Sequence, residues 1–171
     1  MIFSRAPLRI SIGGGGTDLP SYYLKKNGFL ISAAIDKYIY ITLGKTFNKK
    51  FLLKYSDFEE VNNIKKIKHP LFRETLKDLK IKTPVNISSH ADIPAGSGLG
   101  SSGCFTVALI KALAEIEGTK MTKKEIAERA CNIEIKKLKE PVGKQDQYSS
   151  AFGGLRSYKF MKNGEIITKK I

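Results

Sequence analysis

The chain has 171 residues, 42% hydrophobic and 27% charged, which are the proportions of a globular protein of about one domain. It contains no apolar run of about 18 residues and no secretory signal after Met1, so we expect a cytoplasmic protein that does not enter a membrane. Its net charge of +14 suits a nucleic acid, a membrane surface or a phosphorylated small substrate, and the sign of the charge alone does not choose among them. Nucleic acid is disfavoured, because the lysines occur in scattered pairs without an aromatic RNA-binding run or a helix-turn-helix pattern.

The first half of the chain is predicted to be rich in strands. Runs of Ile, Tyr and Thr alternate with other residues, and glycines interrupt them. In chain order we expect a strand at 2–12, a short helix at 19–27, strands at 29–35, 38–46 and 51–55, a helix at 70–79 and a strand at 85–90.

The second half is predicted to contain two helices and a hairpin. Apolar residues recur at helical spacing over 102–117, which indicates one buried face. Thr122 and Glu125 form a capping box that opens a helix reaching Leu138, before Pro141. Strands at 154–160 and 165–171 flank a turn at Asn163 and Gly164. Strands and helices do not alternate strictly, so the fold class is α+β, and no linker or repeat divides the chain.

A glycine-rich turn at residues 92–103 follows the strand at 85–90 and precedes the helix at 102–117. Glycines let backbone N–H groups approach an anion, and a helix N-terminus adds unpaired donors and positive potential. The turn therefore predicts a phosphate or nucleotide site.

Other glycine motifs fit this turn less well. Gly98, Gly100 and Gly103 match the dinucleotide pattern, but a second helix follows where that fold needs a strand. A P-loop would have Lys where this chain has Ser101 and Ser102, and protein-kinase signatures are absent. A flexible surface loop would leave the strand and helix flanks unexplained.

Four polar residues near the turn in sequence, or near the N-terminus, are candidates for chemistry. Asp146 could orient or deprotonate a substrate hydroxyl, or could cap a helix beginning near Gln147. Glu134 could bind Mg²⁺, or could be a solvated glutamate on a helix surface. Arg9 could stabilise a transferring phosphoryl group or hold Asp146 ionised. Asp18 could contact substrate hydroxyls or cap the following helix. The residues alone leave these alternatives open.

The two cysteines, Cys104 and Cys131, have neither the spacing of a redox pair nor that of a metal site. We interpret them as small buried apolar residues.

Three segments together resemble one enzyme superfamily. Residues 94–102 (Pro-Ala-Gly-Ser-Gly-Leu-Gly-Ser-Ser) are similar to the ATP-binding motif of the galactokinase, homoserine kinase, mevalonate kinase and phosphomevalonate kinase (GHMP) superfamily. Residues 6–18 resemble the sugar-binding segment of galactokinases, and residues 143–148 resemble the segment with their catalytic aspartate. The combination is most similar to the D-glycero-D-manno-heptose 7-phosphate kinases, which implies ATP-dependent phosphorylation of the anomeric hydroxyl of a heptose 7-phosphate.

The resemblance also implies roles for individual residues. Asp146 would be the base or orienting group, with Arg9 as its electrostatic partner. Ser102 and Glu134 would bind Mg²⁺. The ATP phosphates would contact the turn, and the sugar would contact the N-terminal segment. The implied ATP-binding residues are Pro94, Gly96, Ser97, Gly98, Leu99, Gly100, Ser101 and Ser102, and the implied substrate-binding residues are Arg5, Gly16, Thr17 and Asp18.

Two departures from the superfamily matter. Galactokinases have a Glu-His pair where this chain has Gly15 and Gly16, so we expect room for a larger or phosphorylated sugar, with Arg5 near its second phosphate. The family fold, of the ribosomal-protein type with a mainly antiparallel sheet and helices on one side, implies a second domain. Residues 1–171 correspond to the N-terminal, ATP-binding domain, and we expect the C-terminal domain to be supplied in cis or in trans. The alternatives are another sugar-1-kinase, such as a fucokinase- or galactokinase-like enzyme, and a non-catalytic basic RNA-binding module of the same fold.

Overall fold

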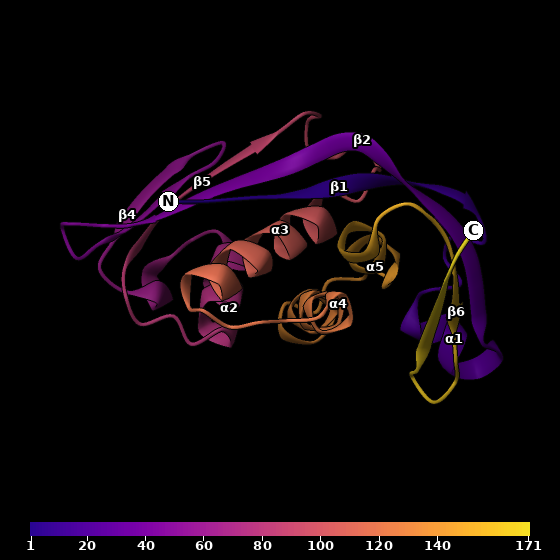
Figure 1. Ribbon diagram of the computed structural model, residues 1–171. Helices are drawn as coiled ribbons and strands as arrows, with labels where there is room; N and C mark the ends of the chain where they lie inside the picture. Colours follow the sequence, from indigo (N-terminus) through magenta and orange to yellow (C-terminus); the bar gives the residue numbers. More distant parts are fainter.

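One long strand forms the centre of the sheet. In the computed structural model, which describes residues 1–171, β2 (Gly28–Lys45) pairs along one edge with β1 (Ile2–Gly13). Its other edge pairs first with β6 (Leu155–Phe160) and further along with β5 (Val85–Ala91), all antiparallel. Figure 1 shows that the sheet curls around the helices that pack beneath β2.

The continuity of β2 corrects the prediction of two strands at 29–35 and 38–46. Asp36 and Lys37, which separate those segments, are exposed but include neither Gly nor Pro. Without such a residue nothing breaks the backbone, and β1 pairs on both sides of this point.

The remaining strands extend the sheet at both ends. The full order is β4-β3-β5-β2-β6-β7, with β1 on the other side of β2, and only the β3–β5 pair is parallel. The added strands are β3 (Phe51–Lys54), β4 (Phe58–Val61) and β7 (Ile166–Lys170). β4 was not predicted from the sequence, whereas the β6–β7 hairpin lies where the Asn-Gly turn indicates.

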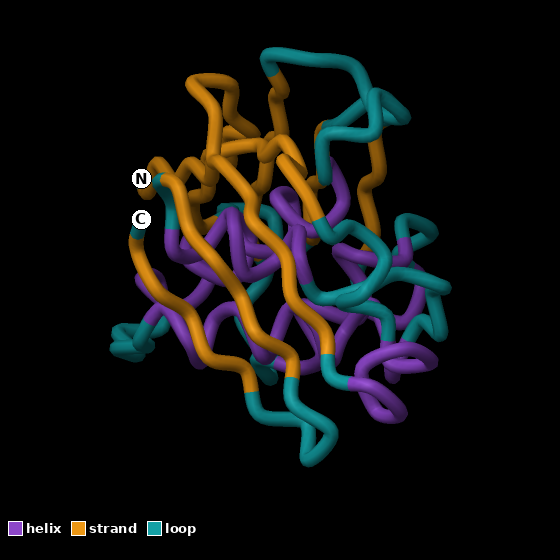
Figure 2. The backbone as a smooth tube through the Cα atoms, turned by 90° about the vertical axis from the view of Figure 1, so that its right-hand side faces the viewer, coloured by secondary structure: helices purple, strands orange, loops and turns teal.

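The helices cover one face of this curled sheet. They are α1 (Pro20–Lys26), α2 (Pro70–Asp78), α3 (Ser101–Ile116), α4 (Lys123–Cys131) and α5 (Gln145–Phe152), with short helical turns η1 (Ile64–Lys66) and η2 (Asn132–Lys137). Figure 1 shows α2 to α5 beneath the sheet, and Figure 2 shows the strands of the C-terminal end in front of the helices. The α+β prediction is confirmed, with a mainly antiparallel sheet and helices on one side.

The core has two parts. A cluster of 24 buried residues lies between the sheet, α2 and α3 and includes residues of α4 and η2. A cluster of eight lies between β2, α1, α4, α5 and the C-terminal hairpin. In α3, 11 of 16 residues are buried, more than the single predicted face, because α2, α4 and α5 surround it below the sheet. Cys104 and Cys131 are buried and unpaired, as predicted. None of the helices is long and apolar enough to span a membrane.

The helix that begins at the predicted capping box ends earlier than expected. The Thr122 hydroxyl accepts the N–H of Glu125, and the Glu125 carboxylate accepts the N–H of Thr122. Regular α-helix stops at Cys131, and residues 132–137 form a wider π-helical turn. Such turns are rare and frequently accompany functional sites, and this one contains Glu134.

Candidate active site

The glycine-rich turn ends at the N-terminus of α3 in the conformation that its glycines allow. Gly96, Gly98 and Gly100 have φ angles of +82°, +73° and +80°, a region that other residues rarely adopt. Gly100 is the left-handed N-cap of the helix. The hydroxyl of Ser101, the first helical residue, is buried without a hydrogen-bond partner in the protein. Free donors at a helix N-terminus make this turn suitable for an anion.

Arg9 of β1 fixes the turn in place. Its backbone N–H donates to the carbonyl of Leu99 at 3.1 Å, and its Nη1 donates to the carbonyl of Gly98 at 2.7 Å. A guanidinium therefore lies at the base of the predicted phosphate site.

The same guanidinium binds Asp146. Arg9 Nε and Nη2 lie 2.7 Å and 2.6 Å from Oδ1 of Asp146, whereas Oδ2 has no hydrogen-bond partner in the protein. Burial raises the pKa of Asp146, and the Arg9 charge and hydrogen bond lower it in part. Asp146 is the second residue of α5, whose N-cap is Lys144. The alternative that Asp146 caps a helix beginning near Gln147 is therefore wrong.

Two glycines allow Asp146 to approach the turn. A Cβ atom at Gly100 would lie 3.0 Å from Cγ of Asp146, and one at Gly103 would lie 2.7 Å from its Cβ. Any side chain at either position would separate the carboxylate from the start of α3. The closeness of α3 and α5 thus depends on these residues.

A cavity of about 730 Å³ opens in front of this arrangement. Its polar lining comprises Arg9, Asp146, Ser101 and Ser102 together with the glycines of the turn. Its apolar and aromatic lining includes Ile39 of β2, Tyr55 just after β3, Ala91 of β5, Leu71 of α2 and Phe105 of α3. This volume falls within the range of small-molecule sites.

Behind the turn, Ser102 is linked to a buried carboxylate. The Ser102 hydroxyl donates to Oε2 of Glu134 at 2.8 Å, and Nε2 of Gln147 donates to Oε1 at 2.9 Å. Glu134 is 1% exposed, so the alternative of a solvated surface glutamate is wrong. Burial raises the pKa of Glu134, and the two hydrogen bonds oppose that shift.

The oxygen atoms of Ser102 and Glu134 are suitable ligands for a magnesium ion. Mg²⁺ is usually held by one or two carboxylates together with phosphate oxygens and waters, and a hydroxyl and a carboxylate lie together here beside the anion-binding turn. No cluster of three or more His, Cys, Asp or Glu residues provides an all-protein metal site. The ion would therefore depend on phosphate ligands for the rest of its coordination.

Asp18 joins the N-terminal glycine turn to α5. Its Oδ1 accepts the N–H of Gly16 at 3.1 Å, and its Oδ2 accepts the N–H of Gln145, the residue before Asp146, at 3.0 Å. A Cβ atom at Gly143 would lie 1.8 Å from Oδ2, so that position also requires glycine. Asp18 does not cap α1, whose N-cap Leu19 makes no side-chain bond, and that alternative is wrong.

The remaining predicted site residues do not line the cavity. The Thr17 hydroxyl lies within hydrogen-bond distance of the backbone of Gly14 and Phe29 and shapes the turn. Arg5 is not brought to the cavity, because its guanidinium packs 4.3 Å from the ring centroid of Tyr38 on the exposed face of the sheet. Pro94, Ser97 and Leu99 belong to the turn but do not line the cavity.

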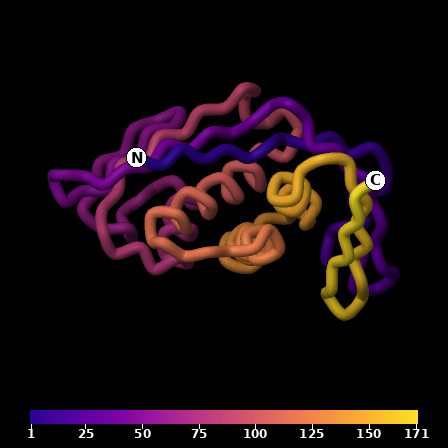
Figure 3. The backbone as a smooth tube through the Cα atoms, viewed as in Figure 1, coloured from indigo at the N-terminus to yellow at the C-terminus, as the bar shows by residue number.

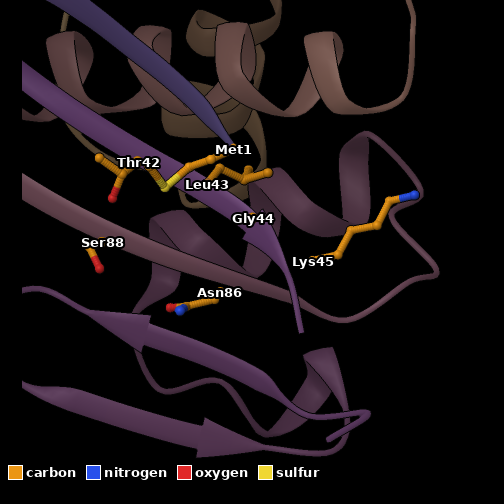
Figure 4. A pocket seen from close by; sticks show the side chains of 7 residues that line it. All are labelled: Met1, Thr42, Leu43, Gly44, Lys45, Asn86 and Ser88. Atoms are coloured by element: carbon orange, nitrogen blue, oxygen red, sulfur yellow. The ribbon is translucent and has the colours of Figure 1, made fainter. Parts of the chain in front are cut away.

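Another hollow, of about 330 Å³, lies beside the start of β1 (Figure 4). It is lined by the residues that Figure 4 labels, Met1, Thr42, Leu43, Gly44, Lys45, Asn86 and Ser88. None of them is an acid, a histidine or a cysteine, and none belongs to the glycine-rich turn, so the cavity at the turn remains the candidate site.

Sequence reasoning missed two glutamines of the site. Gln147 holds Glu134, and the side chain of Gln145 accepts a hydrogen bond from Ser11 of β1 at 3.1 Å. Both are buried, although they belong to a polar run. The one available signal was three polar residues in succession at a helix start, which is also typical of an exposed turn.

Hydrogen bonds join three segments that lie far apart in the sequence, the N-terminal segment, the glycine-rich turn and the start of α5, and Figure 3 shows the course of the backbone through them. The family model described as the GHMP kinases N terminal domain matches residues 62–154. The chain belongs to the GHMP kinase family.

Individual relatives agree with this assignment. D-glycero-alpha-D-manno-heptose 7-phosphate kinase of Campylobacter jejuni is 34% identical over 99% of this chain and 54% of the relative. A galactokinase of Thermotoga neapolitana is 28% identical over 87% of this chain and 43% of the relative. The crystal structure of a D-glycero-D-manno-heptose 1-phosphate kinase from Bacteroides thetaiotaomicron has a TM-score of 0.92 at 28% identity, over all of this chain and 60% of that one. The chain thus spans between two fifths and three fifths of their lengths.

Proposed function

We propose that this chain is the ATP-binding domain of a sugar kinase that phosphorylates the anomeric hydroxyl of D-glycero-D-manno-heptose 7-phosphate. The observation that carries the proposal is the Arg9–Asp146 pair directly beside an anion-binding turn. Phosphoryl transfer depends mainly on positioning and charge stabilisation, and this arrangement provides both.

In this proposal Asp146 accepts the proton of the attacking hydroxyl. Its Oδ2 is free of protein partners, while Oδ1 is held by Arg9. The raised pKa that burial produces makes the carboxylate a stronger base than an exposed aspartate. Arg9 keeps it ionised and fixes its orientation.

The turn and α3 would hold the triphosphate. The backbone N–H groups of residues 96–102 and the unpartnered Ser101 hydroxyl would bind phosphate oxygens. Ser102 and Glu134 would hold Mg²⁺, which when bound supplies positive charge to the phosphates.

The sugar would approach from the side of the N-terminal glycine turn. Asp18 lies next to α5 there, and no atom lies within 4 Å of a Cβ built at Gly16, which leaves space for a substrate larger than galactose. The names of the Campylobacter and Bacteroides relatives support a heptose phosphate as the substrate. The region that follows in those relatives would complete the cleft, in cis or in trans.

The test is a panel of sugars and sugar phosphates incubated with MgATP, scored for ADP release. We expect the heptose 7-phosphate to be the best acceptor. Asp146→Asn should lower turnover by roughly 10²–10⁴-fold, the usual contribution of a general base, with little change in MgATP affinity by calorimetry. The exposed Asp36→Asn is the matched control and should leave both unchanged.

Two results would contradict the proposal. Full turnover in Asp146→Asn would remove this residue from catalysis. Absence of MgATP binding by the unaltered chain would contradict the nucleotide site itself.

A further inference from the structure

Three rings of the cavity lining, those of Tyr55, His69 and Phe105, form an aromatic wall. His69, at the start of α2, lies with its ring centroid 4.7 Å from that of Tyr55 and 5.4 Å from that of Phe105. All three residues line the cavity. Phe105 is less than one helical turn beyond Ser102, so the wall begins about 5 Å along α3 from the anion-binding turn.

Glu59 of β4 binds residues of this wall through hydrogen bonds without lining the cavity itself. Its Oε1 accepts the Tyr55 hydroxyl at 2.9 Å and the backbone N–H of His69 at 3.0 Å, and its Oε2 accepts the N–H of Lys68 at 2.6 Å. Glu59 is 5% exposed and does not line the cavity. Burial raises the pKa of Glu59, but these hydrogen bonds outweigh that effect and hold it below its usual range.

No part of the proposed phosphate or proton chemistry uses Glu59. Burying a carboxylate is costly unless hydrogen bonds satisfy it, so the three groups that donate to Glu59 are held in fixed positions around it. Two of the three donors belong to Tyr55 and His69, whose rings line the cavity. Arg73 of α2 also holds the loop before that helix, since its Nη1 donates to the carbonyls of Ile67 and Lys68, but neither of these contacts reaches a ring that lines the cavity.

We infer that Glu59 is a positioning residue that holds Tyr55 and His69 against the heteroaromatic base of the bound nucleotide. The inference rests on the proposed function, because it needs the phosphates to lie at the turn. With the phosphates there, the base extends along α3 past Phe105 and reaches this wall. Flat aromatic surfaces and a fixed histidine suit a planar ring.

Glu59→Gln tests this inference with two ligands. The amide group that replaces one oxygen would face backbone N–H groups with its own hydrogens, which loosens the wall. We expect roughly tenfold weaker binding of ATP by calorimetry, as for the loss of one good hydrogen bond, and unchanged binding of inorganic tripolyphosphate, which has no base. Glu60→Gln, the exposed neighbour that pairs with Lys50, is the control and should change neither.

A second variant separates positioning from folding. The Nδ1 atom of His69 accepts the N–H of Phe72 and caps α2. His69→Asn keeps a good capping side chain while it removes the ring. It should weaken ATP binding and spare tripolyphosphate binding, with an unchanged circular dichroism spectrum.

The outcomes are distinguishable. Equal affinities of wild type and both variants for ATP would overturn the inference, and so would parallel losses for ATP and tripolyphosphate. If the unaltered chain binds neither ligand, the proposed function itself fails. If the unaltered chain binds ATP and tripolyphosphate equally well, the turn still binds phosphate, but the inferred contact between the aromatic wall and the base is wrong.

Discussion

At the scale of single residues, the guanidinium of Arg9 binds two groups of the site. It holds the carbonyl of Gly98 in the turn and Oδ1 of Asp146 in α5. The side chains of Arg9 and Asp146 are only 14% and 22% exposed, so water screens their attraction less than at a surface. Burial raises the pKa of Asp146, and Arg9 is the group that opposes this and favours the charged carboxylate.

This predicts a pKa change in Arg9→Gln. Burial raises the pKa of Asp146 and Arg9 lowers it, so removal of the guanidinium leaves burial unopposed and the pKa rises further. The carboxyl ¹³C resonance of Asp146 in a pH titration measures it directly. The variant should also lose stability as pH rises through that higher pKa, because the folded state then favours the protonated form.

Arg5→Gln is the control for this experiment. Arg5 lies on the same strand but packs on Tyr38, so its removal should leave the Asp146 resonance unchanged. An unaltered or lowered pKa in Arg9→Gln would show that Arg9 does not stabilise the carboxylate.

At the scale of elements, the first turn of α5 is the junction of the site. Gln145 contacts Asp18 and Ser11 at the N-terminal segment, Asp146 contacts Arg9, and Gln147 contacts Glu134 in η2. Because side chains on one helical turn point in different directions, three successive residues can reach three elements. The approach of α3 to α5 at Gly103 holds this junction against the anion-binding turn.

Gly103→Ala tests that approach. Alanine favours a helix over glycine by about 1 kcal/mol, but its Cβ would lie 2.7 Å from Cβ of Asp146 and 3.1 Å from the backbone nitrogen of Gln147. Overpacking costs about 1–3 kcal/mol, so we expect a net loss of stability in urea unfolding. Gly44→Ala in β2, where no atom lies within 4 Å, should change stability by less than about 0.5 kcal/mol. Equal effects of the two substitutions would show that α3 and α5 can separate without cost.

At the scale of the whole molecule, the curled sheet and the charge are the dominant features. β2 pairs with strands from both halves of the chain, so the sheet wraps the helices and brings the N-terminal turn to α5 (Figure 1). A net charge of +14 on a chain of this size produces repulsion that opposes compaction.

Sodium chloride should therefore stabilise the fold. Screening of the repulsion predicts a rise of roughly 2–4 °C in the unfolding midpoint between low salt and about 0.2 M NaCl, which corresponds to about 1 kcal/mol. Differential scanning calorimetry measures the midpoint, and chloride is chosen because sulfate or phosphate would occupy the proposed site. The rise should shrink when four exposed lysines without ion pairs, Lys25, Lys26, Lys65 and Lys66, are replaced by Gln. A midpoint that falls with salt would mean that the ion pairs outweigh the repulsion.

Much of this protein could be predicted from local pattern. The amphipathic helix at α3, the capping box of α4, the hairpin turn and the glycine-rich turn have short-range signals, because each depends on residues within a few positions of one another. The resemblance of three segments to GHMP kinases identified the family correctly. β4 and the π-helical turn had no such signal, since pairing with β3 and packing around Glu134 decide them.

The sequence by itself determined which residues are candidates for the site: a basic residue on a strand, Arg9, the glycine-rich turn, and the acids Asp18, Glu134 and Asp146. Only the tertiary structure decided what each acid contacts, because the partners named here lie 32, 127 and 137 residues away in the sequence. Asp146 accepts a hydrogen bond from Arg9, Asp18 accepts the N–H of Gln145 at the N-terminus of α5, and the buried Glu134 accepts the hydroxyl of Ser102. Arg5 packs on Tyr38 outside the cavity. Burial and long-range hydrogen bonds have no local pattern, so they emerge only when the sheet brings distant segments together.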